Sequence, residues 1–379
     1  MEHPASLTDL SVQAARILAP DAPPQLRMMA ASGLAPLGPV DLVSVLYALS
    51  YNQDESLATK AGASLGKLPD KVLLGALEQD LDPAVLDGVA RLLVRRDDAV
   101  ERVVLNRLVH DETIVWLTEN LRSEKLLEIV AANEERMLRA PRIIEALYMN
   151  KAARMSTVDR AIELAVRNGL KLDGIPTFSE AKAAIEGQLI PEESDELQKE
   201  NDDFSAALND DKLLDVDDAT LDDILDSLES PEDSSQNTDK IEEAVAVGAS
   251  LAILTVSQKI RMAMLGNSTQ RAVLVRDSNR LVTMAVLKSP GIGDSEVIRY
   301  SRARSLPEEA VRYIASRREW TKQYQIKVNL VNNPRTPLQD ALRFLNHLRP
   351  IDVRGLERSK DVPQSIVNAA KQLRQKRSR

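Results

Sequence analysis

The chain has 379 residues, no cysteine and a formal net charge of −9 at pH 7. This length predicts two or three domains, and a chain without cysteine has no disulfide, thiolate metal site or cysteine nucleophile, which fits a reducing compartment. Hydrophobic residues make up 44% of the chain but aromatic residues only 3%, so stacked helices with aliphatic cores are favoured over a β-sandwich.

The N-terminal residues contain no basic segment followed by an apolar one, so we expect no secretory signal. The longest uncharged run, Ala244–Gln258, has 15 residues. A membrane-spanning helix needs roughly 20 apolar residues, so a buried helix is the better interpretation of this run. We therefore expect a cytoplasmic protein with no membrane span.

Residues 1–191 form the first predicted module because they repeat with a period near 29 residues. Three matching dipeptides are 29 residues apart, namely Asp82-Pro83, Asp111-Glu112 and Ala140-Pro141. Apolar residues follow each at the same offset, namely Val85, Ile114 and Ile143. Each copy is typical of a helix start, where aspartate accepts backbone N–H bonds and proline occupies the first turn. Asp54, Asp82 and Asp111 are the predicted N-caps.

A second helix is predicted between successive copies, over 39–50, 70–78, 98–106 and 123–132. Further helices are predicted over 156–168 and 179–187. A helix pair of this size buries its apolar face only by stacking on its neighbours. The pattern resembles the short bacterial type of HEAT-like repeat, an α-solenoid, most clearly over residues 24–170. That resemblance implies an extended surface for binding partners.

Residues 192–239 are predicted to be an acidic disordered linker. The stretch 192–243 contains 21 acidic residues and three lysines, a net charge of −18. Two less charged islands interrupt it, 204–214 and 220–228. In the second, a candidate docking motif places four apolar residues on one helical face: Leu221, Ile224, Leu225 and Leu228. Such a stripe is typical of a segment that folds on binding into a groove, and a solvated spacer is the alternative.

Residues 240–379 form the second predicted module, which is basic and helical. Residues 244–379 contain 25 basic and 10 acidic side chains, a net charge of +15. The longest predicted helix is 240–265. It is followed by helices over 268–276, 279–288, 295–302, 307–316, 320–332, 337–345, 350–357 and 363–375. The similar segments 281–290 and 326–337 each contain an apolar helix that ends at Ser-Pro or Asn-Pro, and these dipeptides, Ser289-Pro290 and Asn333-Pro334, are 44 residues apart. The similarity favours a second set of helical repeats, with a compact irregular helical domain as the alternative.

The candidate residues for binding a partner or an anion are basic residues of this second module: Arg271, Arg276, Arg280, Arg304, Arg317, Arg318, Lys322 and Arg343. Arginine pairs bidentately with carboxylate and phosphate alike, so an acidic protein segment, the chain's own linker and nucleic acid are all possible ligands. Near Arg317 and Arg318, Trp320 is a possible stacking residue. A tryptophan at a helix start is more often part of the core.

The sequence contains no recognisable catalytic constellation. The three histidines, His3, His110 and His347, are not at metal-ligand spacing, and there is no phosphate-binding loop or GxSxG nucleophile motif. We expect no enzyme, cofactor or metal. The favoured hypothesis is a non-catalytic scaffold or adaptor that binds protein partners, regulated by docking of the acidic linker on the basic module. The alternative is a nucleic-acid-binding protein acting through residues 240–379.

Overall fold

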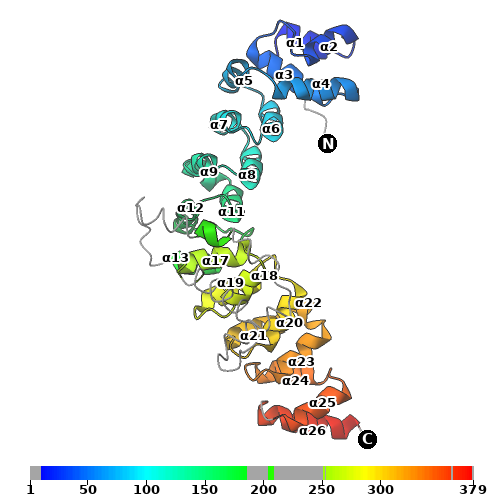
Figure 1. Ribbon diagram of the computed structural model, residues 1–379, viewed down its shortest axis with the longest axis vertical. Coiled ribbons are helices and arrows are strands. Elements are labelled where there is room, and N and C mark those ends of the chain that lie inside the picture. Colours follow the sequence, from blue (N-terminus) through cyan, green and yellow to red (C-terminus); the bar gives the residue numbers. More distant parts are fainter. Residues whose placement is uncertain (1–9, 186–203, 209–250, 252, 360–361, 378–379) are drawn as a thin grey trace, which may run out of the picture. The chain divides into compact units, whose positions relative to one another are not determined.

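The computed structural model of the protein describes residues 10–185, 204–208, 251, 253–359 and 362–377. In these ranges the protein is all-helical and has no strand, which confirms the all-α part of the predicted fold class. The chain divides into two compact units, Met1–Leu172 (unit 1) and Asp173–Arg379 (unit 2) (Figure 1). None of the helices in these ranges is long and apolar enough to cross a membrane.

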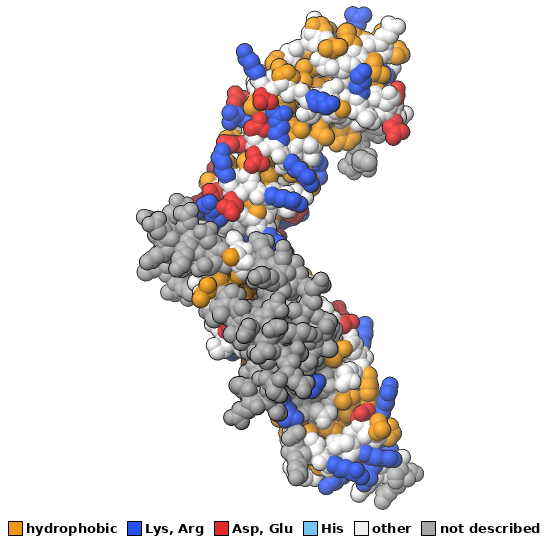
Figure 2. Space-filling model, viewed as in Figure 1, with side chains coloured by type: hydrophobic (Ala, Val, Ile, Leu, Met, Phe, Trp, Pro, Cys, Tyr) orange, Lys and Arg blue, Asp and Glu red, His pale blue; other side chains and the backbone are white. Residues whose placement is uncertain are grey.

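Unit 1 consists of short helices joined by turns. They are α1 (Val12–Leu18), α2 (Pro24–Ala31), α3 (Pro39–Ser50), α4 (Glu55–Gly66), α5 (Asp70–Leu77), α6 (Pro83–Leu92), α7 (Asp97–Leu105), α8 (Asp111–Asn120), α9 (Glu124–Ala131), α10 (Glu134–Arg139), α11 (Arg142–Met149) and α12 (Met155–Arg167). From α5 onwards they form two rows: α5, α7, α9 and α12 contact in succession, and so do α6, α8 and α11. Figure 2 shows acidic and basic side chains alternating along one edge of this unit.

The predicted helix starts are confirmed at two of three aspartates. Asp54 and Asp82 are N-caps, and each accepts a hydrogen bond from a backbone N–H of the first turn. The prediction for Asp111 was wrong, because His110 is the N-cap and Asp111 is the first helical residue. Its carboxylate instead accepts two hydrogen bonds from Arg139, at 2.7 and 2.8 Å. These bonds lower the pKa of Asp111.

Buried asparagines connect successive repeats. At the end of α7, the Asn106 amide donates to the carbonyl oxygens of Leu77 and Gln79, 2.8 and 2.9 Å away at the end of α5. At the end of α11, Asn150 does the same to Thr118 and Leu121 at the end of α8. The bonds span 27 to 32 residues, so the period near 29 corresponds to a physical contact between repeats.

Gly88 in α6 lies against the buried ring of Tyr47 in α3, and a Cβ at this position would overlap that ring. Burial of Tyr47 raises its pKa to about 12. We expect Gly88→Ala to lower the free energy of unfolding by about 1–3 kcal/mol through overpacking, measured by urea denaturation. The matched control is Gly75→Ala in α5, where a Cβ meets nothing within 4 Å. That change should stabilise by about 0.5–1 kcal/mol, and equal effects of the two would contradict the prediction.

The described helices of unit 2 begin with α13 (Phe178–Ile185). They continue with α17 (Val256–Leu265), α18 (Ser268–Leu274), α19 (Arg280–Lys288), α20 (Asp294–Arg302), α21 (Glu308–Ser316), α22 (Arg318–Thr321), α23 (Tyr324–Asn332), α24 (Leu338–Leu345), α25 (Pro350–Arg358) and α26 (Gln364–Arg377). The sequence placed 179–187 with the N-terminal module. In the structure α13 contacts α17 and α19, and Glu180 forms an ion pair with Lys288 at 2.6 Å.

Two helix predictions in unit 2 need correction. The predicted helix 240–265 does not run through Thr255, because Thr255 caps α17 in a capping box with Gln258. The part of that prediction over 240–250 lies outside the described residues. The predicted helix 320–332 is two helices, α22 and α23, separated by an extended residue at Gln323.

Candidate partner-binding site in the C-terminal unit

A cluster of aromatic and basic side chains lies at the junction of α21 and α22. Arg317 has an extended backbone conformation and ends one helix while capping the next, so the chain turns there and returns Trp320 towards Tyr313. The rings of Tyr313 and Trp320 meet edge to face with centroids 5.9 Å apart. The Arg317 guanidinium lies 4.7 Å from the centre of the Tyr313 ring and also donates a hydrogen bond to the Tyr313 hydroxyl.

Arg343 of α24 reaches the same junction. Its guanidinium donates to the carbonyl oxygen of Ala315, 2.9 Å away at the end of α21, pairs with Asp340 at 3.1 Å and lies over the Phe344 ring. Arg318 and Lys322, one turn apart, are exposed. Neither forms an ion pair with any residue the structure describes. The cluster therefore brings together Arg317, Arg318, Lys322 and Arg343.

Trp320 does not belong to the core. It is half-buried, and α22 contributes no fully buried residue, so the expectation of a core tryptophan is wrong. The reason is that α22 is a single turn of four residues. Such a short helix has too little apolar surface to bury the whole tryptophan side chain. A half-buried tryptophan beside arginine is available for contact with a ligand.

A second arginine–aromatic pair lies at the α23–α25 contact. The Arg349 guanidinium lies 4.5 Å from the centre of the Tyr324 ring, and the Arg349 backbone N–H donates to the Tyr324 hydroxyl at 2.8 Å. That hydroxyl donates to Asp352. Partial desolvation, and then this bond to a carboxylate, raise the pKa of Tyr324. Figure 2 shows mainly Lys and Arg among the charged side chains over the C-terminal helices of this unit.

The other candidate residues have different surroundings. Arg280 pairs with Glu309 at 2.7 Å. Arg276 and Arg304 follow α18 and α20, and neither is without an interaction partner. The motif Leu221, Ile224, Leu225 and Leu228 lies outside the described residues.

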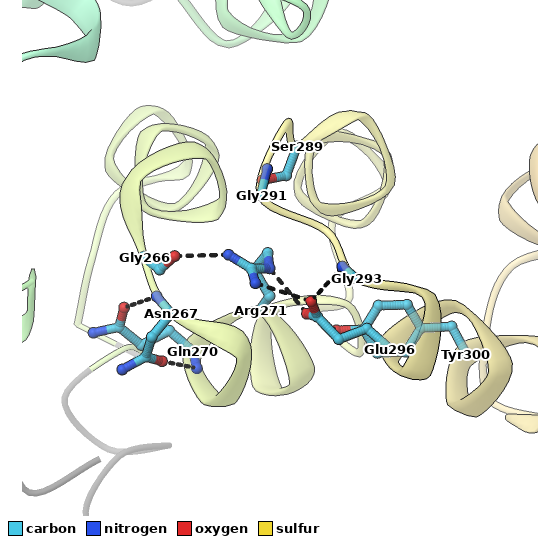
Figure 3. Close-up of polar contacts among 9 residues, drawn as sticks. All are labelled: Gly266, Asn267, Gln270, Arg271, Ser289, Gly291, Gly293, Glu296 and Tyr300. Carbon is cyan, nitrogen blue, oxygen red and sulfur yellow. Dashed lines mark hydrogen bonds and ion pairs between the residues drawn. The ribbon is translucent and has the colours of Figure 1, made fainter. Parts of the chain in front are cut away.

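Arg271 is buried in an ion pair and presents no guanidinium to a ligand (Figure 3). It donates to both carboxylate oxygens of Glu296, each at 2.9 Å, and to the Gly266 carbonyl oxygen at 2.7 Å. Glu296 also accepts from the Gly293 N–H at 2.8 Å and the Tyr300 hydroxyl at 3.2 Å. Burial, first, and the neighbouring carboxylate raise the pKa of Tyr300. The cluster fixes α18 against the start of α20.

Residues 204–208, from the first island of the acid-rich stretch, are helical and belong to unit 2. Phe204, Ala207 and Leu208 are buried. The Phe204 ring centre lies 5.2 Å from the buried guanidinium of Arg261 in α17. The side-chain amide of Gln270 in α18 donates to the Ala207 carbonyl oxygen at 2.6 Å. We call the surface formed by Arg261 and Gln270 the α17–α18 seat.

Sequence analysis did not identify Gln270, Glu296 or Arg261 as site residues. A signal for Gln270 was present, because Asn267 and Gln270 fit the spacing of a capping box, in which a polar residue three positions after the N-cap returns to it. The structure contains that box. No comparable local signal exists for Glu296, whose partner Arg271 is 25 residues away.

Unit 1 contains a small pocket of about 240 Å³ between α9, α10 and α12. Apolar and charged side chains both line it: Ala131, Ala132, Met137, Ala161 and Leu164, with Glu128, Glu134 and Arg160. The buried hydroxyl of Thr157, which also lines the pocket, has no hydrogen-bond partner among the described residues. In the same described part of the chain, no three His, Asp or Glu side chains are grouped closely enough to hold a metal ion.

Comparisons of the chain with protein-family models, with curated proteins and with solved structures found no match.

Proposed function

We propose that the protein is a non-catalytic scaffold or adaptor that binds protein partners through its helical-repeat surfaces, and that its acidic stretch regulates the basic unit by docking on it. One observation carries the proposal: Phe204, Ala207 and Leu208, which belong to the stretch of net charge −18, are buried within unit 2, beside α17 and α18. Unit 2 therefore has a surface that accepts an apolar helical stripe from an acidic segment.

The repeat architecture supports this proposal. Successive helices of unit 1 contact the next member of the same row, which is how HEAT-like solenoids present extended binding surfaces, although inferring function from a fold is analogy. The absence of cysteine fits a cytoplasmic adaptor, because reducing conditions make disulfides unnecessary there.

Affinity capture from the source cells, quantified by mass spectrometry, tests the adaptor function. The immobilised full chain should retain a reproducible set of proteins with acidic segments. An Arg317→Glu/Trp320→Ala variant should lose at least part of this set, because the exposed Arg317 and the half-buried Trp320 both lie in the arginine–aromatic cluster at the junction of α21 and α22. Arg142→Glu is the control, since Arg142 forms an exposed ion pair with Glu112 in unit 1. If the wild-type chain captures no specific set, the adaptor function is wrong.

The second candidate function is binding of single-stranded nucleic acid by unit 2. The observation that favours it is the recurrence of arginine over an aromatic ring within one part of the unit, at Tyr313, Phe344 and Tyr324. Bases stack on aromatic and guanidinium planes, while unpaired cations contact phosphates. Arg318 and Lys322 supply such cations beside the first pair.

Fluorescence anisotropy of a labelled 20-nucleotide single strand with the full chain tests this candidate. Binding through about four phosphate contacts should weaken by roughly 50-fold between 50 and 200 mM salt. Arg317→Glu/Arg318→Glu should weaken it further at each salt concentration. An Arg139→Glu/Arg142→Glu chain has the same net charge and should bind like the wild type. Salt-independent binding, or equal loss in both variants, would exclude a specific nucleic-acid site in the cluster.

A further inference from the structure

The helix at residues 204–208 presents a single apolar stripe to the α17–α18 seat. Its buried residues Phe204, Ala207 and Leu208 are at positions i, i+3 and i+4, whereas Ser205 and Ala206 between them are exposed. That arrangement matches the way in which amphipathic peptide helices bind grooves in other proteins. The stripe is flanked by aspartates at 202, 203, 210 and 211.

Within the seat, Gln270 is held in position by interactions that do not involve residues 204–208. The Gln270 side-chain oxygen accepts from the Asn267 N–H at 2.9 Å in the capping box, which leaves its amide group directed at Ala207. The next residue, Arg271, is fixed by Glu296 (Figure 3). The peptide-holding group is therefore preorganised, and preorganisation lowers the cost of binding a ligand.

Residues 204–208 are far along the sequence from the other described parts of unit 2. In the sequence, 18 residues separate them from α13 and 42 separate them from Leu251. An extended chain spans up to about 3.3 Å per residue, so stretches of this length are long enough for residues 204–208 to leave the seat while α13 and Leu251 stay in place.

We propose that the α17–α18 seat is a recognition site for short, acidic, amphipathic helices, occupied in cis by residues 204–208. A partner helix can take their place when it has the same pattern: a large apolar residue, a small residue three positions later and a leucine four positions later. The inference rests on the proposed adaptor function and assigns it a partner class. The net positive charge of residues 244–379, which contain 25 basic and 10 acidic side chains, favours an acidic ligand.

The test uses a fluorescein-labelled peptide of residues 199–213 and the full chain. Wild-type protein should bind the peptide weakly, because the tethered segment competes at an effective concentration on the order of millimolar. Phe204→Ala should empty the seat and strengthen peptide binding at least ten-fold, measured by anisotropy. The control Ser205→Ala changes an exposed residue of the same helix and should bind like the wild type.

A second substitution locates the bound peptide. Phe204→Ala/Gln270→Glu keeps the oxygen that completes the capping box but loses the amide that donates to Ala207, so peptide binding should fall back at least ten-fold. Equal binding by Phe204→Ala and wild type, or no effect of Gln270→Glu, would overturn the proposal.

Hydrogen exchange of the wild-type chain tests the proposal without any substitution, so its result holds even when a variant fails to fold. The amides of 204–208 should exchange at least ten-fold faster than those of α17. Equal rates would show that the segment is an integral part of unit 2, and the proposal would fall. Affinity capture is independent of both readouts, so the adaptor function can stand when this inference fails.

Discussion

Replacing Arg271 by methionine should lower the free energy of unfolding of unit 2 by about 3–5 kcal/mol, because it leaves a buried carboxylate without its cation. The side chains of Arg271 and Glu296 are only 7% and 4% exposed. Methionine retains the apolar stem of arginine, so lost packing is small. Two remaining donors, the Gly293 N–H and the Tyr300 hydroxyl, satisfy Glu296 only in part.

Urea denaturation followed by circular dichroism measures this effect, with an exposed ion pair as the control. Arg312 pairs with Glu308 one turn away on α21, and both are more than half exposed. Arg312→Met should change the free energy of unfolding by no more than about 0.5 kcal/mol. Similar losses of stability in the two variants would show that breaking the buried Arg271–Glu296 pair costs no more than breaking an exposed ion pair.

The double variant Arg271→Met/Glu296→Leu separates the value of the pair from the cost of breaking it. Replacing both buried charges by apolar groups is often neutral or stabilising. The double variant should therefore recover more than half of the stability lost by Arg271→Met alone. A further loss would indicate that the hydrogen bonds from Gly293 and Tyr300 to the carboxylate hold the α19–α20 connection in place.

The sequence predicted helices well where start signals and apolar spacing agreed. Helix α3 has the predicted bounds, 39–50, and Asp82-Pro83 marks the start of α6 as expected. Within the predicted helix 240–265 the prediction failed at Thr255, because apolar spacing continues through the position where α17 is capped. Thr255 and Gln258 form that capping box, and the spacing of the two residues was visible in the sequence.

The candidate site was less predictable because charge counts do not reveal partners. Arg271 and Arg318 are indistinguishable in a count of basic residues. The first is buried against a glutamate 25 residues away, and the second is exposed. Long-range pairing depends on how the helices pack, which local patterns do not encode. The seat for Phe204 was hidden for the same reason, since Arg261 and Gln270 lie more than 50 residues further along the sequence.

Asn150→Ala should destabilise unit 1 by about 2–4 kcal/mol, because it leaves two buried carbonyl groups without donors. The Asn150 amide donates to Thr118 at 2.6 Å and Leu121 at 2.9 Å, while its oxygen accepts from the Ala152 N–H at 2.8 Å. These bonds join α11 to the end of α8, so the loss weakens the contact between two repeats and not one helix alone.

The same kind of asparagine contact occurs in unit 2. The Asn333 amide, after α23, donates to the carbonyl oxygens of Ser301 and Ala303 at the end of α20, and its oxygen accepts from the Arg335 N–H. Ser289, 44 residues earlier in the similar segment, accepts from the Gly291 N–H but is too short to reach the preceding helix as asparagine does. In both units, therefore, a buried asparagine amide joins its helix to carbonyl groups about 30 residues earlier in the chain.

Two further variants, measured by urea denaturation, show whether the bonds from the Asn150 amide to the earlier helix stabilise the unit, or whether Asn150 acts only as a helix cap. Asn150→Asp keeps the acceptor for Ala152 but directs a carboxylate oxygen at the two carbonyl groups, so it should destabilise at least as much as Asn150→Ala. Asn120→Ala removes an exposed amide that donates only within α8, to Trp116, and should cost no more than about 0.5 kcal/mol. If Asn150→Asp is as stable as the wild type, the oxygen alone is sufficient and the repeats are held together by their apolar contacts.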